Sequence, residues 1–238
     1  MRANLDYTLF PVISCYFLLS GVSSHPMNHS FPHDTDGLRA EIAIAAARMI
    51  AEDGADYSTA KRKAARQILG VAHSDMLPDN AQIEEEVRLY NELFLADSQP
   101  QRLLHLRQLA LRLMRELEKF NPYISGAVLN GTAGEHSDIH LQLFYDNPKD
   151  VEIFLLNKNV NFDVSESEHF KPRRMEVIET LSFMWQGEGV ILSLYAQDDL
   201  RGALKLRADG RPQRANLAGL EALMALDAAA IIDEDDSK

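Results

Sequence analysis

Three polar residues at alternate positions have the types and spacing that could do chemistry. His136, Asp138 and His140 lie at i, i+2 and i+4 of a stretch in which Ile139, Leu141 and Leu143 alternate with polar residues. Strand side chains alternate between the two faces, so the three would share one face. Two imidazoles and a carboxylate suit zinc, iron or manganese better than magnesium. The alternative is that these polar side chains line a solvated cleft.

A glycine-rich turn precedes this stretch. Asn130-Gly131 is a strong turn signal, and it follows the apolar pair Val128 and Leu129. Gly131 and Gly134 would allow successive backbone N–H groups to point at an anion. An ordinary tight turn explains the same residues equally well.

A Gly-Thr turn followed by Ser-Asp-Ile-x-Leu on a strand resembles the nucleotidyltransferase superfamily, the DNA polymerase beta-like fold. The resemblance implies that Gly131, Thr132 and Ser137 bind the triphosphate. It makes Asp138 the first catalytic acid and places His140 where the family has its second. It also implies magnesium or manganese as cofactor.

The acid set that the resemblance calls for is incomplete. The family's third acid comes from a neighbouring strand, and Ser193 is the expected occupant here. Glu135, Glu152 and Glu179 are the acids that could compensate. Hard cations such as magnesium are usually coordinated by several carboxylates. We therefore expect a nucleotide-binding protein whose transferase activity is weak or absent.

A second hypothesis is a catalytically inactive binding or regulatory module that holds a protein partner. Other enzyme classes lack their motifs: there is no Walker A lysine loop, Gly-x-Ser-x-Gly elbow or dinucleotide fingerprint. A UDP-N-acetylmuramate–alanine ligase would need a Gly-Lys-Thr phosphate loop, and the Gly-Thr pair here has no lysine.

The bulk composition is that of a globular protein. The chain has 238 residues, 46% hydrophobic and 25% charged, with a net charge of −12. The negative charge disfavours wholesale binding to nucleic acid. Cys15 is the single cysteine, so no internal disulfide can form, which suits a reducing compartment. We expect a cytoplasmic protein of bacterial type that does not bind membranes.

The first residues allow two interpretations. Residues 10–22 form an apolar run that is too short for a comfortable membrane span. One interpretation is a cleaved export signal. The other, which we favour, is a start placed too far upstream, with Met27 as the true start.

The remaining pattern predicts an α+β fold: a helical N-terminal domain followed by a nucleotidyltransferase-like mixed β-sheet with flanking helices. The expected domains are a leader at 1–36, the helical domain at 37–120, the α+β domain at 121–228 and an acidic tail at 229–238. Strands are expected at 123–129, 138–145, 160–164, 175–185 and 190–195. A late basic cluster could contact a phosphate or balance Asp198, Asp199 and Asp209; its members are Arg201, Lys205, Arg207, Arg211 and Arg214.

Overall fold

A computed structural model describes residues 35–70, 74–170, 176–204, 206–207 and 210–235. Residues 1–34 of the predicted leader, with Met27 and the apolar run at 10–22, lie outside the described residues, as do Lys205 and Asp209; the last two leader residues, Thr35 and Asp36, begin α1. Within the described ranges, no helix is long and apolar enough to cross a membrane.

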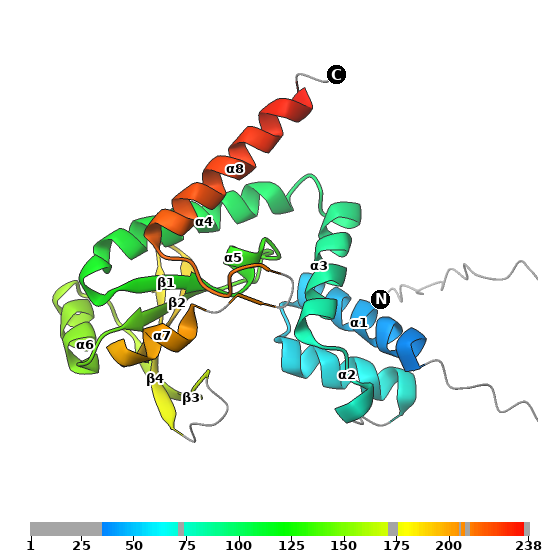
Figure 1. Cartoon of the computed structure of the whole chain (residues 1–238), viewed down its shortest axis with the longest axis horizontal. Coiled ribbons are helices and arrows are strands. Elements are labelled where there is room, and N and C mark those ends of the chain that lie inside the picture. The colour runs from blue at the N-terminus through cyan, green and yellow to red at the C-terminus, as the bar shows by residue number, and fades with distance from the viewer. Residues whose placement is uncertain (1–34, 71–73, 171–175, 205, 208–209, 236–238) are drawn as a thin grey trace, which may run out of the picture. The chain divides into compact units, whose positions relative to one another are not determined.

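Three helices come first and pack around a small core of their own (Figure 1). They are α1 (Thr35–Asp53), α2 (Tyr57–Leu69) and α3 (Asn80–Phe94). Gly70 ends α2 in the left-handed conformation with φ 76°, as a C-terminal glycine does. Asp79 begins α3 with a capping box, its side chain accepting from the Gln82 backbone N–H. The core of this helical part is built from small and branched residues: Ile42, Ala46, Ala64, Ile83 and Val87.

A five-stranded mixed sheet follows, with strand order β1-β2-β5-β4-β3. Neighbouring strands are antiparallel except β2 and β5, which are parallel. The strand bounds are β1 Pro122–Ser125, β2 Ile139–Phe144, β3 Asp163–Glu168, β4 Val177–Trp185 and β5 Glu188–Tyr195. The sheet and helices confirm the predicted α+β class.

One face of the sheet is covered by helices, as Figure 1 shows. These are α4 (Gln99–Glu116), α6 (Pro148–Asn157) and α8 (Leu217–Asp235). Together with the sheet they bury the main core, which includes Leu106, Leu113, Leu141, Leu192 and Leu220. Residues of α4 therefore belong to the main core, whereas α1, α2 and α3 pack around their own small core. The domain boundary expected near residue 120 stays a prediction.

The opposite face of the sheet is only partly covered. The short helix α7 (Leu200–Ala203) packs there over an aromatic cluster formed by Tyr123, Phe144 and Tyr195. His140, Gln142 and Ser193 remain exposed or half-buried on this face. We call it the open face of the sheet.

Two predicted strands differ from those observed. The strand expected at 123–129 ends at Ser125, because Gly126 turns the chain with φ 73° and α5 (Ala127–Asn130) begins. Val128 and Leu129 are buried in either arrangement, so the apolar run could not distinguish a strand from a short helix. The strand expected at 160–164 is β3, which begins at Asp163 and is almost entirely exposed.

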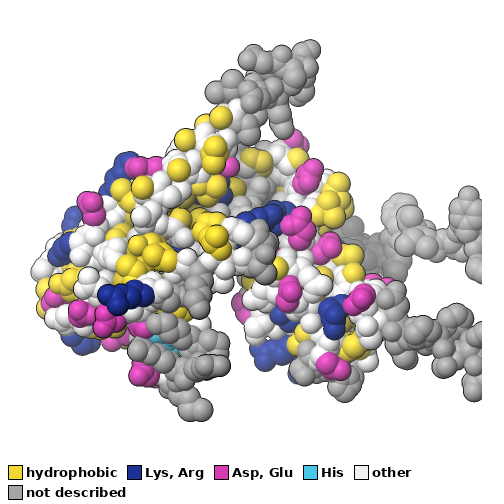
Figure 2. All heavy atoms as spheres, viewed as in Figure 1, with side chains coloured by type: hydrophobic (Ala, Val, Ile, Leu, Met, Phe, Trp, Pro, Cys, Tyr) yellow, Lys and Arg dark blue, Asp and Glu magenta, His cyan; other side chains and the backbone are white. Residues whose placement is uncertain are grey.

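The surface is unevenly apolar. Figure 2 shows hydrophobic side chains along α8 and on the neighbouring part of the protein. Leu226 of α8 is 69% exposed, and Leu104 of α4 is 46% exposed. These side chains form an exposed apolar surface on two of the helices that cover the sheet, α4 and α8.

Candidate functional site

Asp138 lies immediately before β2, on the open face of the sheet. The register that pairs Ile139 with Val190 brings Asp138 beside Gly189 of β5. A Cβ built at Gly189 would stand 2.0 Å from the Asp138 Oδ1 atom. The missing side chain at Gly189 therefore makes the room that the Asp138 carboxylate occupies.

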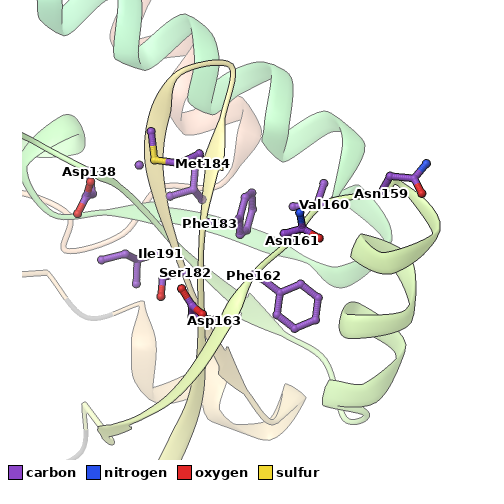
Figure 3. A pocket seen from close by; sticks show the side chains of 12 residues that line it. Asp138, Asn159, Val160, Asn161, Phe162, Asp163, Ser182, Phe183, Met184 and Ile191 are labelled. Atoms are coloured by element: carbon purple, nitrogen blue, oxygen red, sulfur yellow. The ribbon is translucent and has the colours of Figure 1, made fainter.

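The carboxylate opens onto a cavity of about 680 Å³ (Figure 3). Asp163, at the start of β3, lines the same cavity. Pairing runs from Asp163 through Ser182 of β4 and Ile191 of β5 to His140, so two strands separate Asp163 from β2. Sequence reasoning missed Asp163 and Gly189, because only the strand pairing brings them to this place. Other lining residues are Asn159, Asn161, Phe162 and Met184.

His140 follows Asp138 on the same face. A Cβ built at Gly126 would lie 3.6 Å from the His140 Cβ and Cδ2 atoms, so the imidazole stands beside the chain reversal after β1. Its outer surface is exposed. Neighbouring protein atoms displace water from the ring and lower the pKa of His140, an effect that the Asp138 charge partly opposes. The lowered pKa favours a neutral imidazole.

His136 does not join this pair. It precedes β2 and lies in the loop, so the strand alternation assumed from the sequence does not reach it. Its Cβ would be 2.5 Å from a Cβ built at Gly54, after α1, and it lines a different cavity with Arg102 and Glu188. Among the described residues, no group of three or more His, Cys, Asp or Glu side chains is arranged to hold a metal ion.

The backbone N–H groups of the Gly131-Thr132 turn donate hydrogen bonds within the protein. The N–H groups of Gly131, Thr132 and Ala133 all donate to the Ala127 carbonyl, at 3.0, 3.0 and 3.2 Å. On its other side, the Gln99 amide of α4 donates to the carbonyls of Gly131 and Ala133. The phosphate cradle expected from the sequence would need these same N–H groups, and here they have internal acceptors.

The other two residues of the predicted phosphate site are also engaged. Thr132 is buried, with its side chain beside Tyr57 of α2. The Ser137 Oγ atom accepts from the Gly134 N–H at 3.0 Å and so closes the loop just before Asp138. Ser137 therefore contributes to the site by holding the loop that leads into Asp138.

The acids that might have completed the site lie elsewhere. Glu179 of β4 shares the helix-covered face with Leu181, and Lys149 contacts both Glu179 and Glu152. Burial raises the pKa of Glu179, and a hydrogen bond with Glu152 raises it further. Glu135 is exposed in the loop that lines the cavity beside His136. Ser193 of β5 pairs with Gln142, which lies four residues along the chain from Asp138.

Comparisons with known proteins give little further information. No protein-family model matches the chain, and no curated protein matches its sequence. A solved structure titled as the GLD-2/RNP-8 complex aligns with 19% identity and a TM-score of 0.28. The alignment covers 49% of this chain and 48% of that one, about half of each. A likeness at this level shows neither a shared family nor a shared function.

Proposed function

We propose that the open face beside Asp138 binds a nucleotide through one divalent cation, magnesium or manganese. The observation that carries the proposal is the Asp138 carboxylate, which stands over Gly189 at the edge of a cavity of about 680 Å³. Small-molecule sites commonly measure roughly 300–1,000 Å³. Carboxylate oxygens are the ligands that hard cations prefer, and a cation bound there would attract phosphate groups.

Transferase activity is weak or absent in this proposal. Two-metal phosphoryl chemistry relies on several carboxylates to hold both ions. His140 occupies the next position on the strand face and supplies an imidazole in place of a carboxylate; its lowered pKa favours the neutral form. Phosphate contacts from Gly131 and Thr132 would require the turn to release its bonds to Ala127.

Calorimetry tests the proposal directly. The full chain is titrated with each nucleoside triphosphate, with and without manganese, alongside Asp138→Asn and Asp163→Asn. We expect manganese-dependent binding by the parent and by Asp163→Asn, and none by Asp138→Asn. A nucleotide labelled at the α-phosphate, mixed with the parent, measures transfer in the same preparation. Equal affinities in all three proteins would rule out Asp138 as the cation ligand.

The second candidate function is a binding module for a protein partner. A cavity of about 630 Å³ lies between α4 and α8, lined by apolar residues that include Leu103, Leu104, Leu223 and Met224. Leu104, which lines the cavity, is 46% exposed, and this exposed apolar side chain favours an apolar segment as the occupant. A photocrosslinking residue at position 224 would capture such a partner, and Leu104→Glu should abolish the crosslink.

A further inference from the structure

The late basic cluster contains one arginine whose environment differs from that of the others. Arg214 directly precedes Ala215, whose backbone forms two hydrogen bonds with Ile124 along the free edge of β1. Ala215 and Ile124 are buried against the main core. Alternation along this extended segment directs Arg214 to the open face, the face that carries Asp138 and His140.

The Arg214 guanidinium is held in place there by neutral groups. Its Nε atom donates to the Gln142 Oε1 atom of β2, and its Nη1 atom donates to the Ala203 carbonyl at 2.9 Å. Nη1 also lies 3.2 Å from the Gln213 Oε1 atom. The guanidinium carbon stands 4.3 Å from the centre of the Phe170 ring. Stacking and these neutral acceptors fix the orientation of the guanidinium plane.

Buried and half-buried arginines elsewhere in the described chain have a carboxylate partner. Arg107 pairs with Asp227, Arg102 with Glu188, and Arg207 with Glu84. Within the described residues, Arg214 forms no ion pair, and Tyr195 is the one titratable group that acts on its charge. A buried cation without a counter-ion is costly, because desolvation is not offset by an opposite charge.

The guanidinium also keeps donors for a ligand. Its Nη2 atom donates to no acceptor among the described residues, and the side chain is only partly buried. An arginine fork with an oriented plane and unused N–H groups matches the oxygen geometry of a phosphate.

We propose that Arg214 forms a phosphate-binding subsite on the open face, at the end of β2 away from Asp138. Gln142, which holds Arg214, lies four residues along β2 from Asp138, about 13 Å at the usual strand rise. A ligand that reaches both places is extended, with one anionic group at the Asp138 cation and a second at Arg214. The inference of an extended ligand rests on the proposed function, whereas the inference of a phosphate subsite at Arg214 does not.

Inorganic phosphate is the probe that separates the two proposals. The full chain, Arg214→Gln, Arg214→Lys and Asp138→Asn are each melted with and without phosphate at constant ionic strength, using chloride as the reference salt. Arg115→Gln is the matched control, because Arg115 is exposed and pairs with Glu221 on the surface. Each variant is compared with its own phosphate-free melting temperature, which removes the effect of lost contacts to Gln142 and Phe170.

We expect phosphate to raise the melting temperature of the parent, Asp138→Asn and Arg115→Gln, and to leave that of Arg214→Gln unchanged. Arg214→Lys keeps the charge and loses the fork, so its phosphate affinity should fall about tenfold, as expected for one lost charge-assisted hydrogen bond. If Arg214→Gln does not fold, the Arg214 Nε–H resonance of the parent is followed during the phosphate titration, and no shift would overturn the subsite.

The same shift in Arg214→Gln as in the parent, or no shift in the parent, would also overturn it. Neither result bears on manganese-dependent nucleotide binding at Asp138. Conversely, a parent protein that binds no nucleotide in the presence of manganese but still responds to phosphate would overturn the function proposed at Asp138 and leave the Arg214 subsite standing.

Discussion

The Asp138 carboxylate occupies the space that a side chain at residue 189 would fill, since a Cβ at Gly189 would stand 2.0 Å from its Oδ1 atom. Glycine at this position leaves room for the Asp138 carboxylate, which approaches from just before the neighbouring strand; the Gly189 backbone itself does not call for glycine, because its φ is not in the left-handed region. The absence of a side chain at Gly189 therefore allows the Asp138 carboxylate to take its observed position.

Gly189→Ala should displace the carboxylate while the protein still folds. The alanine methyl forces the Asp138 side chain to rotate, which costs about 1 kcal/mol of stability for a small overpacked site. Manganese affinity should fall as well, because the oxygen leaves its position. Urea unfolding and manganese titration measure the two effects.

A double mutant is the control for this change. In an Asp138→Ala background the methyl meets no carboxylate, so Gly189→Ala should cost nothing further. An undiminished penalty in that background would show that Gly189 is constrained by something other than Asp138.

Glu84 of α3 joins the helical part to the sheet part through charge. Its side chain is 4% exposed, and it pairs with Arg88 and with Arg207, the latter at 2.6 Å. The Asn130 amide donates to the same carboxylate at 3.0 Å. Glu84→Gln removes the negative charge that holds both arginines, so we expect a loss of about 3–5 kcal/mol in urea unfolding.

Glu85 provides a matched comparison one residue later. Its side chain is 68% exposed and also pairs with Arg88. Exposed ion pairs contribute about 0–1 kcal/mol, so Glu85→Gln should be nearly neutral. Similar losses in the two variants would contradict the role given to buried Glu84.

The sequence contained enough to predict the fold class and the position of β2. Apolar residues at Ile139, Leu141 and Leu143 specify a strand with one buried face, and all three are buried. Helix ends such as Asp79 and Gly70 are also specified locally, because caps depend on neighbours in the chain.

The candidate site could be predicted only in part. Asp138 and His140 share a face because strand alternation is local, but Asp163 reaches the cavity through the pairing of four strands. The turn at Gly131 is a second example. Its sequence indicates a turn, yet the Ala127 carbonyl that takes its N–H groups belongs to a helix that the apolar pattern did not reveal.

Leu106 and Leu104 of α4 should respond differently to truncation. Both belong to the apolar set of the helix, but Leu106 is fully buried in the sheet core and Leu104 is 46% exposed. We expect Leu106→Ala to cost about 2–5 kcal/mol, since it leaves a cavity. Leu104→Ala should stay within about 0.5 kcal/mol. Chemical denaturation compares them, and equal costs would contradict the observed orientation of α4.

His140 should make stability depend on pH in a direction that can be worked out. Its folded pKa is lowered, mainly by burial, so between the folded and unfolded pKa values the unfolded chain binds more protons. The contribution of neutral His140 to stability should therefore be fully present above its unfolded-state pKa, about 6.5. This contribution should be lost as the pH falls through the folded-state pKa. His140→Gln should flatten this part of the curve relative to the parent.

The charge of Asp138 raises the pKa of His140. The carboxylate charge favours the imidazolium and so opposes the effect of burial. Asp138→Asn removes that charge, and the pKa of His140 should drop further, as measured from its ring resonances during an NMR titration. Asp163→Asn is the control, because Asp163 lies on β3 with two strands between it and β2. A rise in the pKa of His140 on Asp138→Asn, or an equal drop on Asp163→Asn, would show that the Asp138 charge does not act specifically on the His140 imidazole.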